Sequence, residues 1–351
     1  MFKQILNSIF ELLFRNITMR KLIIGIILQF ILLACQPFEK SLNMETNDRK
    51  NFSCSVESGL CKEHTHSDIE EIHIQPVNKI TVLYYTDPIC SACWAIEPEL
   101  KKLKLLYGDY MNIEYKMGGL LPNWEGFSDS GNGISRPKDV AEHWDEVGEY
   151  SGMSINGDVW LEDPLHSSFP PSIAFKAMQN QGYEISIKFL RRIREMVFLE
   201  KKNITKESHL TDAVKDCGGN VDQFLKDYTD PATEQAFRQD LTEGRRMGVR
   251  NFPTFLFLGV DGKGFKITGM TNFDNFVKAL EQARGKKVTA KHLDVNAIEL
   301  LKNYPLLSTK ELSVILNKDF TTTLQELEKA EVEGQVKEHI HKFGSFWSLV
   351  N

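Results

Sequence analysis

The chain has 351 residues, of which 42% are hydrophobic and 26% are charged, so it is long enough for a sizeable core and for two domains. These fractions are ordinary for a soluble globular protein. The formal net charge of −6 gives no reason to expect a nucleic acid or an anionic membrane surface as a partner. Cysteine is too scarce for a disulfide-stapled scaffold of this length, so the positions of the cysteines carry more information than their number.

The N-terminus has the pattern of a bacterial lipoprotein leader. Residues 22–34 form an apolar run that follows two basic residues and is too short to span a bilayer. The run ends directly before Cys35 and resembles a lipobox, at which the signal is cut and the cysteine is lipidated. We therefore expect residues 1–35 to be a leader whose true start is Met19. The mature protein would then be a membrane-anchored lipoprotein of the cell envelope, facing the periplasm or the outside. The alternatives are an uncleaved apolar anchor and a cytoplasmic protein with a spurious extension.

Residues 36–78 are predicted to be a flexible tether, because their first part is polar, mixed in charge and without an apolar period. Cys54 and Cys61 lie in this segment and are followed by His64 and His66. Thiolates and imidazoles suit zinc, so these four residues are weak candidates for a metal site. A local disulfide between the two cysteines is the better-supported alternative. No cofactor is predicted elsewhere in the chain.

The clearest chemical pattern is a cysteine pair between a strand and a helix. Residues 80–85 are β-branched and aromatic and predict a buried strand, and residues 94–107 have apolar positions at helical spacing. Cys90 then lies near unpaired backbone N–H groups at the positive end of the helix dipole, which favours its thiolate. Cys93 lies one turn deeper, so we predict Cys90 as the nucleophile and Cys93 as the resolving thiol. Zinc sites also use this spacing, but they usually need a second pair, and the upstream cysteines have the wrong spacing for one.

The rest of the chain alternates between strands and a long helical stretch. After a strand at residues 112–117, helical periodicity predicts helices at 137–150, 171–181, 184–200, 205–217 and 221–228. Pro253 then opens an apolar strand at residues 254–259, and a second strand at 265–268 and a helix at 272–284 follow. Taken alone, Pro253 would be a trans proline at the first residue of an ordinary strand.

Residues 86–98, which carry the cysteine pair, and residues 248–254 together resemble the DsbA-like thioredoxin family. Within that family the chain is most similar to the branch of the FrnE-type proteins and the YjbH/SpxH protease adaptors. The resemblance implies an α/β thioredoxin fold over residues 79–286, with a DsbA-like helical insertion at about residues 120–247.

The resemblance also implies the site. It makes Cys90 and Cys93 a redox pair that acts on protein thiols and disulfides, and it makes Pro253 a cis proline beside that pair. The backbone at Phe252 and Thr254 would bind the extended chain of a substrate. The chain departs from the strongly oxidising members of the family because Ser-Ala, rather than Pro-His, separates its cysteines. Without an imidazole to stabilise the thiolate, strong oxidising power is not implied.

Residues 287–351 lie outside this fold and predict a small α+β module that resembles a winged helix. One helix begins at the serine cap Ser308, a second covers residues 319–332, and a hairpin covers residues 335–341 and 345–350. The second helix carries several glutamates and few basic residues, which would repel phosphate. We therefore predict no nucleic-acid partner and assign the module a docking or structural role.

Two functions remain open from the sequence. The leading interpretation is an enzyme, a membrane-tethered protein dithiol–disulfide oxidoreductase that acts on protein substrates and works with a redox partner protein. The alternative is an adaptor that presents client proteins to a protease, which would keep its activity without Cys90 and Cys93. A glutathione-dependent isomerase is a third possibility, but that branch has serine where Cys90 stands.

Overall fold

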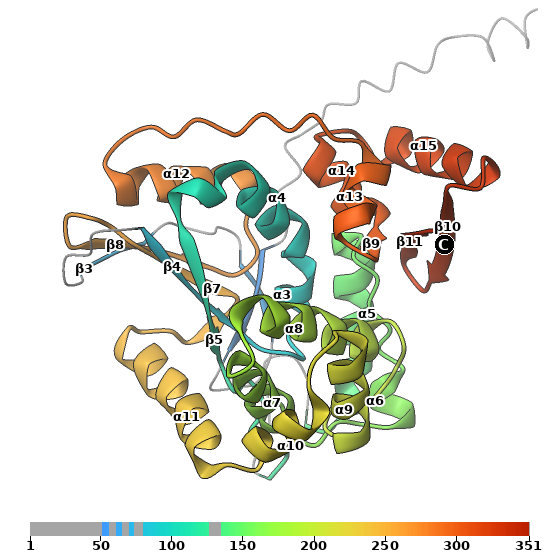
Figure 1. Cartoon of the computed structure of the whole chain (residues 1–351). Helices are drawn as coiled ribbons and strands as arrows, with labels where there is room; N and C mark the ends of the chain where they lie inside the picture. The colour runs from blue at the N-terminus through green and yellow to red at the C-terminus, as the bar shows by residue number, and fades with distance from the viewer. Residues whose placement is uncertain (1–50, 56–60, 65–69, 74–79, 126–134, 351) are drawn as a thin grey trace, which may run out of the picture. The chain divides into compact units, whose positions relative to one another are not determined.

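A mixed sheet of five strands organises the computed structural model (Figure 1). The structure describes residues 51–55, 61–64, 70–73, 80–125 and 135–350. The strand order is β3-β8-β7-β4-β5, with bounds Glu70–His73, Lys263–Thr268, Thr254–Leu258, Thr81–Thr86 and Asn112–Met117. β4 and β5 run parallel, and the other neighbours are antiparallel. The strands predicted around the cysteine pair are thereby confirmed.

Helices lie on both sides of this sheet. In Figure 1, α4 (Glu97–Tyr107) and α12 (Phe273–Arg284) lie on one side and α11 (Pro231–Arg246) lies on the other. The single helix predicted at residues 94–107 is divided into α3 (Ser91–Ala95) and α4. Pro98 lies in the first turn of α4, where its missing backbone N–H is tolerated. In the interior of one continuous helix the same proline would remove a hydrogen bond and clash with the preceding turn, so the helix is divided. A 3-10 turn, Gly108–Tyr110, follows α4.

The helical insertion between β5 and the second half of the sheet is present. It contains α5 to α10, with bounds Asp139–Ser151, Val159–Glu162, Phe169–Gln179, Tyr183–Phe198, Glu207–Asp216 and Val221–Tyr228, and then α11. The five predicted helices are confirmed, whereas α6 and α11 were not predicted. α11 had a local signal, because Asp230 caps it through a bond from the N–H of Ala232 at 2.8 Å and Pro231 opens it.

The C-terminal segment builds a module with its own apolar core. It contains α13, β9, α14, α15, β10 and β11, with bounds Ala297–Asn303, Leu307–Ser308, Thr309–Leu316, Phe320–Val332, Val336–His341 and Gly344–Leu349. The two predicted helices and the hairpin are confirmed, and α13 and β9 are additions. Ser308 forms a capping box with Glu311, as expected of a serine cap. The buried residues that this core shares include Leu301, Leu312, Leu327 and Trp347.

The segment predicted to be a flexible tether contains three short strands. β1 (Asn51–Ser55) and β2 (Cys61–His64) form an antiparallel hairpin, and β3 pairs with β8 at the edge of the central sheet. β1 also pairs with β6 (Asn251–Phe252), which directly precedes the strand β7. Pairing with an existing strand edge needs no local apolar pattern, so the sequence of this segment did not reveal it. The predicted leader, including Met19, lies outside the described residues.

Candidate redox site

Cys90 and Cys93 lie where β4 gives way to α3, as the sequence predicts. β4 ends at Thr86, and Cys90 is the N-cap residue of α3 with an extended backbone. The Sγ atom of Cys90 accepts a hydrogen bond from the backbone N–H of Cys93 at 3.2 Å, as an N-cap side chain does. Both side chains are 0% exposed. Local helix geometry therefore holds the pair, and the surrounding chain covers it.

The turn that leads into Cys90 is built on a buried carboxyl group. The side chain of Asp87 accepts hydrogen bonds from the backbone N–H of Ile89 at 3.1 Å, from that of Leu120 at 2.8 Å and from the hydroxyl of Ser168 at 2.9 Å. Burial raises the pKa of Asp87 to about 6, although these hydrogen bonds favour the carboxylate. Asp87 thus ties the turn to two other segments of the fold.

Pro253 occupies the place that the resemblance implies. The Phe252–Pro253 peptide bond is cis, and Thr254 pairs with Tyr85 across β7 and β4. Pro253 therefore lies at the end of β7 beside the end of β4, from which the turn to Cys90 departs. The catalytic role of Pro253 and the substrate-binding roles of Phe252 and Thr254 remain predictions.

The electrostatics of the two thiols differ from the sequence-based expectation. Burial raises the pKa of Cys90, and the hydrogen bond with Cys93 raises it further. Burial also opposes ionisation of Cys93, but the hydrogen bond from Cys90, the cation of Arg194 and a hydrogen bond with Thr86 lower the pKa of Cys93 overall. The N-cap geometry predicted for Cys90 is present, yet in this covered arrangement Cys93 is the more acidic thiol because its neighbours stabilise the anion.

Arg194 is the buried cation behind the pair, and it was not predicted as a site residue. Its guanidinium donates to Glu97 Oε1 at 2.7 Å, to the hydroxyl of Thr86 and to the carbonyl oxygen of Asp87 at 3.3 Å. Burial opposes ionisation of Glu97, but the cations of Lys101 and Arg194 lower its pKa, so Glu97 is held as a carboxylate. The ion pair therefore keeps the positive charge of Arg194 beside Cys93, while the carboxylate of Glu97 balances that charge.

A signal for Arg194 was present in the sequence. In α8, Arg194 falls on the same helical face as the buried residues Leu190, Ile193 and Val197. A charged residue at a position of the apolar face indicates a buried ion pair, because an unpaired buried charge would be strongly unfavourable. The identity of its partner could not be read from this pattern.

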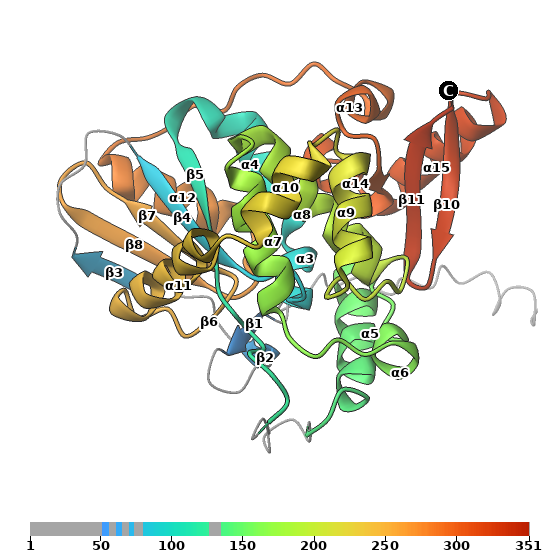
Figure 2. The ribbon, with the colours of Figure 1, turned by 60° about the horizontal axis from the view of Figure 1, so that its bottom comes forward.

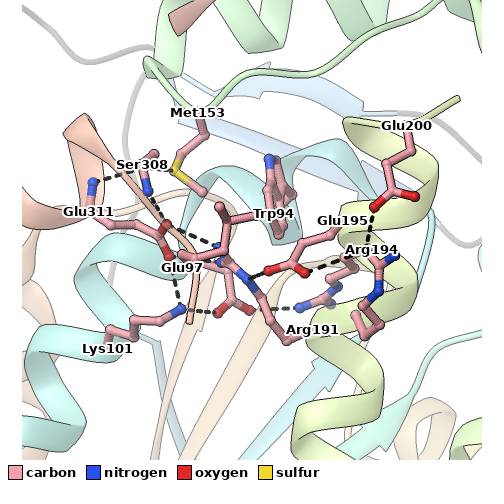
Figure 3. Close-up of polar contacts among 12 residues, drawn as sticks. Trp94, Glu97, Lys101, Met153, Arg191, Arg194, Glu195, Glu200, Ser308 and Glu311 are labelled. Atoms are coloured by element: carbon pink, nitrogen blue, oxygen red, sulfur yellow. Dashed lines mark hydrogen bonds and ion pairs between the residues drawn. The ribbon is translucent and has the colours of Figure 1, made fainter. Parts of the chain in front are cut away.

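A network of charges joins α4, the helix that follows α3, to the C-terminal module (Figure 3). The carboxylate of Glu311, on α14, accepts hydrogen bonds from Nζ of Lys101 on α4 at 2.8 Å and from the guanidinium of Arg191 on α8 at 2.8 and 3.1 Å. The Nζ atom of Lys101 also lies 3.4 Å from Oε2 of Glu97. Glu311 has a fully buried side chain, and although burial opposes ionisation, Arg191 and Lys101 lower its pKa to about 2. A continuous chain of charges thus runs from the module through Glu97 to Arg194.

Aromatic packing makes a second link between the module and the site. Trp94, which directly follows Cys93, stacks on Phe346 of β11 with ring centroids 6.1 Å apart and on Phe198 at 5.5 Å. The guanidinium carbon of Arg191 lies 4.4 Å from the centroid of a Trp94 ring. The indole N–H of Trp94 donates to the carbonyl oxygen of Ser154 at 3.0 Å. The module therefore contacts the residue next to the redox pair.

The remaining predicted site residues precede the strands of the central sheet in the sequence. The backbone register of the β1–β2 hairpin places Cys54 opposite Cys61, and His64 ends β2. His66 and the lipidation candidate Cys35 lie outside the described residues. Among the residues that the structure does describe, no group of three or more metal-binding side chains gathers. No described helix is both long and apolar enough to span a bilayer.

A helical insertion between β5 and β6 distinguishes a DsbA-like thioredoxin fold from a plain one, and the arrangement of the cysteine pair and Pro253 is of this class. The family model described as thioredoxin matches residues 83–278. The chain belongs to the thioredoxin-fold family, in its DsbA-like SpxH branch.

Two relatives support this assignment to the branch. The ClpXP adapter protein SpxH of Halalkalibacterium halodurans is 33% identical over 84% of this chain and 96% of its own length. The ClpXP adapter protein SpxH of Shouchella clausii is 31% identical over 87% of this chain and 99% of its own. A solved structure named as a candidate protein disulfide isomerase, from Nitrosomonas europaea, covers 59% of this chain and 96% of its own, with 17% identity and a TM-score of 0.50. That last likeness concerns the fold alone.

Proposed function

We propose that this chain is an adapter that binds a client protein and presents it to a ClpXP-type protease. The observation that carries the proposal is its similarity to the SpxH adapters over nearly their whole length. The burial of Cys90 and Cys93 supports the same choice, because thiols with 0% exposure are poorly placed for rapid turnover of many substrates. The partners are then a client protein and the protease.

Degradation by a purified ClpXP protease tests this proposal. A bacterial cell extract is incubated with the protease, with and without the chain, and protein levels are followed by quantitative mass spectrometry. We expect at least one protein to be degraded faster only when both components are present. The Cys90→Ser, Cys93→Ser double variant should support the same degradation. If no protein depends on the chain, the adapter proposal is wrong; if only the wild type is active, binding requires the redox pair.

A second candidate function is protein dithiol–disulfide exchange at Cys90 and Cys93. The strand-to-helix setting of the pair beside Pro253 and the lowered pKa of Cys93 favour it. A Cys93→Ser variant should then accumulate mixed disulfides with other proteins through Cys90. If none form under conditions in which a control thioredoxin variant traps its substrates, this candidate fails.

The place of action separates the two candidates. An adapter for ClpXP would work in the cytoplasm, whereas a lipid-modified Cys35 would place the chain in the cell envelope and favour the oxidoreductase. With the adapter function we therefore propose a cytoplasmic location for this chain. Mass spectrometry of the mature N-terminal peptide decides, because it detects either an acylated Cys35 or an unmodified upstream sequence.

A further inference from the structure

The β1–β2 hairpin lies against the strand that precedes Pro253. β1 pairs with β6 in antiparallel register, with Cys54 opposite Phe252 and Ser55 opposite Asn251. An extended segment that adds to a free strand edge is a general mode of peptide recognition, in which main-chain hydrogen bonds supply the affinity. The position in which the sequence predicts a substrate strand is therefore taken by a segment of this chain.

The same hairpin lies beside the redox helix. β1 contacts α3, the helix that Cys90 caps. Figure 2 shows β1 and β2, in blue, next to β6 and close to α3. Because β6 leads into β7, which pairs with β4 up to the turn before Cys90, β6 and the turn share one end of the sheet. β1, β6 and α3 thus converge at the site, and Cys90 is fully buried there.

The register within the hairpin brings two cysteines together. Cys54 is directly opposite Cys61 on the antiparallel pair β1–β2. Directly opposite residues of such a pair have Cα atoms about 4.5–5.5 Å apart, and disulfides usually join Cα atoms about 4.4–6.8 Å apart. β1 is the middle strand of the order β2-β1-β6, so Cys54 lies one strand nearer to Phe252 than Cys61 does.

We propose that the β1–β2 hairpin is an internal substrate of the redox pair, and that Cys54 and Cys61 exchange a disulfide with Cys90 and Cys93. The juxtaposition of β1 with β6 and α3 carries this inference, which does not depend on adapter activity.

The exchange is balanced within one chain. Cys90 loses its proton and attacks Cys54 of the Cys54–Cys61 disulfide, which forms a Cys90–Cys54 bond and releases Cys61 as a thiolate that takes up a proton. The Cys93 thiolate then attacks Cys90, which forms the Cys90–Cys93 disulfide and releases Cys54 as a thiolate that is protonated in turn. Two electrons pass from the Cys90–Cys93 dithiol to the hairpin disulfide. The oxidising equivalent enters from a small disulfide such as oxidised glutathione.

The hairpin also limits the access of outside substrates to the redox pair. An outside strand must displace β1 before it can pair with β6, so the hairpin competes with it at the effective concentration of a tethered group, on the order of millimolar. The hairpin therefore screens the redox pair and accepts its electrons at the same site.

A matched pair of full-length variants tests the exchange. Cys93→Ser combined with Cys61→Ser leaves Cys54 and Cys90, and Cys93→Ser combined with Cys54→Ser leaves Cys61 and Cys90. Both are treated with oxidised glutathione, alkylated and mapped by disulfide mass spectrometry, with circular dichroism as the check on folding. We expect a Cys54–Cys90 link in the first variant and at least roughly tenfold less Cys61–Cys90 link in the second, because β1 and not β2 adjoins β6.

Dilution provides the second measurement. The rate of Cys54–Cys90 formation should be unchanged on roughly tenfold dilution of the protein, since both thiols belong to one chain. A rate that falls in proportion to protein concentration, equal linkage in the two variants, or glutathione-modified Cys90 without any link to Cys54 would each overturn the proposal. The same rate measured on the Cys217→Ser background excludes a contribution from the thiol in the insertion.

Discussion

Cys93 is the thiol whose surroundings stabilise a negative charge, and Arg194 is the cation that contributes to this. Replacement of Arg194 by methionine should raise the pKa of Cys93, because it removes a cation that stabilises the Cys93 thiolate. Titration of thiolate absorbance in the ultraviolet, with and without Cys93→Ser, measures the change. Arg192→Met is the matched control, since Arg192 on the same helix pairs with Glu200 and Asp216 instead. An unchanged Cys93 titration in Arg194→Met would contradict the assignment.

Asp87 makes stability depend on pH in a sense opposite to that of most carboxylates. Its pKa is about 6 when folded and 3.8 in the reference state, so the folded protein holds the proton more tightly. The protonated Asp87 carboxyl therefore stabilises the folded state, fully below the unfolded pKa, and this stabilisation is lost as the pH rises through about 6. At 1.36 kcal/mol per pKa unit, the loss is on the order of 3 kcal/mol.

The Asp87→Asn variant isolates this contribution, because an amide does not titrate. The stability of the wild type relative to the variant should fall as the pH rises from about 4 to about 6, and stay constant above that window. Denaturant unfolding of both proteins over a pH series measures the difference. A difference that is flat, or that grows with pH, would show that the Asp87 carboxyl is not perturbed upward by burial.

At the scale of elements, the position of β6 depends on one close approach. A Cβ atom added at Gly118 would lie 2.0 Å from Cζ of the Phe252 ring, so Gly118→Ala must displace that ring. We expect a loss of about 1–3 kcal/mol in the free energy of unfolding. The amides of Asn251 and Phe252 should also exchange hydrogen faster, because β6 moves with the ring. Gly108→Ala is the control, since no atom lies within 4 Å of its added Cβ. Equal effects of the two substitutions would be inconsistent with this packing.

The elements that the sequence predicted are those with a local signal. The strand before Cys90, the helix cap at Ser308 and the proline before β7 depend on neighbours in the sequence. The partners of Glu97 and Glu311 could not be predicted in the same way. Arg194 is 97 residues from Glu97, and Glu311 is 210 residues from Lys101. Pairing over such separations is decided by the packed fold, and the same is true of β1 against β6.

At the scale of the whole molecule, Glu311 makes the attachment of the C-terminal module sensitive to acid. Its folded pKa of about 2 lies below the reference value of 4.5. Such a depressed carboxyl stabilises the folded state above its unfolded pKa, and this stabilisation is lost as the pH falls from about 5 to about 2. The contribution at neutral pH is on the order of 3 kcal/mol, since the side chain is fully buried.

Glu311→Gln should therefore destabilise the protein at neutral pH, with a gap to the wild type that closes as the pH approaches 2. Tryptophan fluorescence, to which Trp94 contributes where it stacks on Phe346, and denaturant unfolding provide two measurements of the same event. Glu326→Gln is a suitable control, because Glu326 forms an exposed ion pair with Lys318 within the module. A gap that persists unchanged at low pH would mean that the charge of Glu311 does not hold the module.

The buried charge network also limits how the C-terminal module can be reused in protein engineering. A module grafted onto another thioredoxin-fold domain would bring Glu311 without Arg191 and Lys101, and would bury an unpaired carboxylate at the new junction. The reverse deletion would expose Trp94 and leave two cations without their shared anion. A transplant must move Glu311, Arg191 and Lys101 as one set, so the two parts of this chain form a single unit of design although each has its own core.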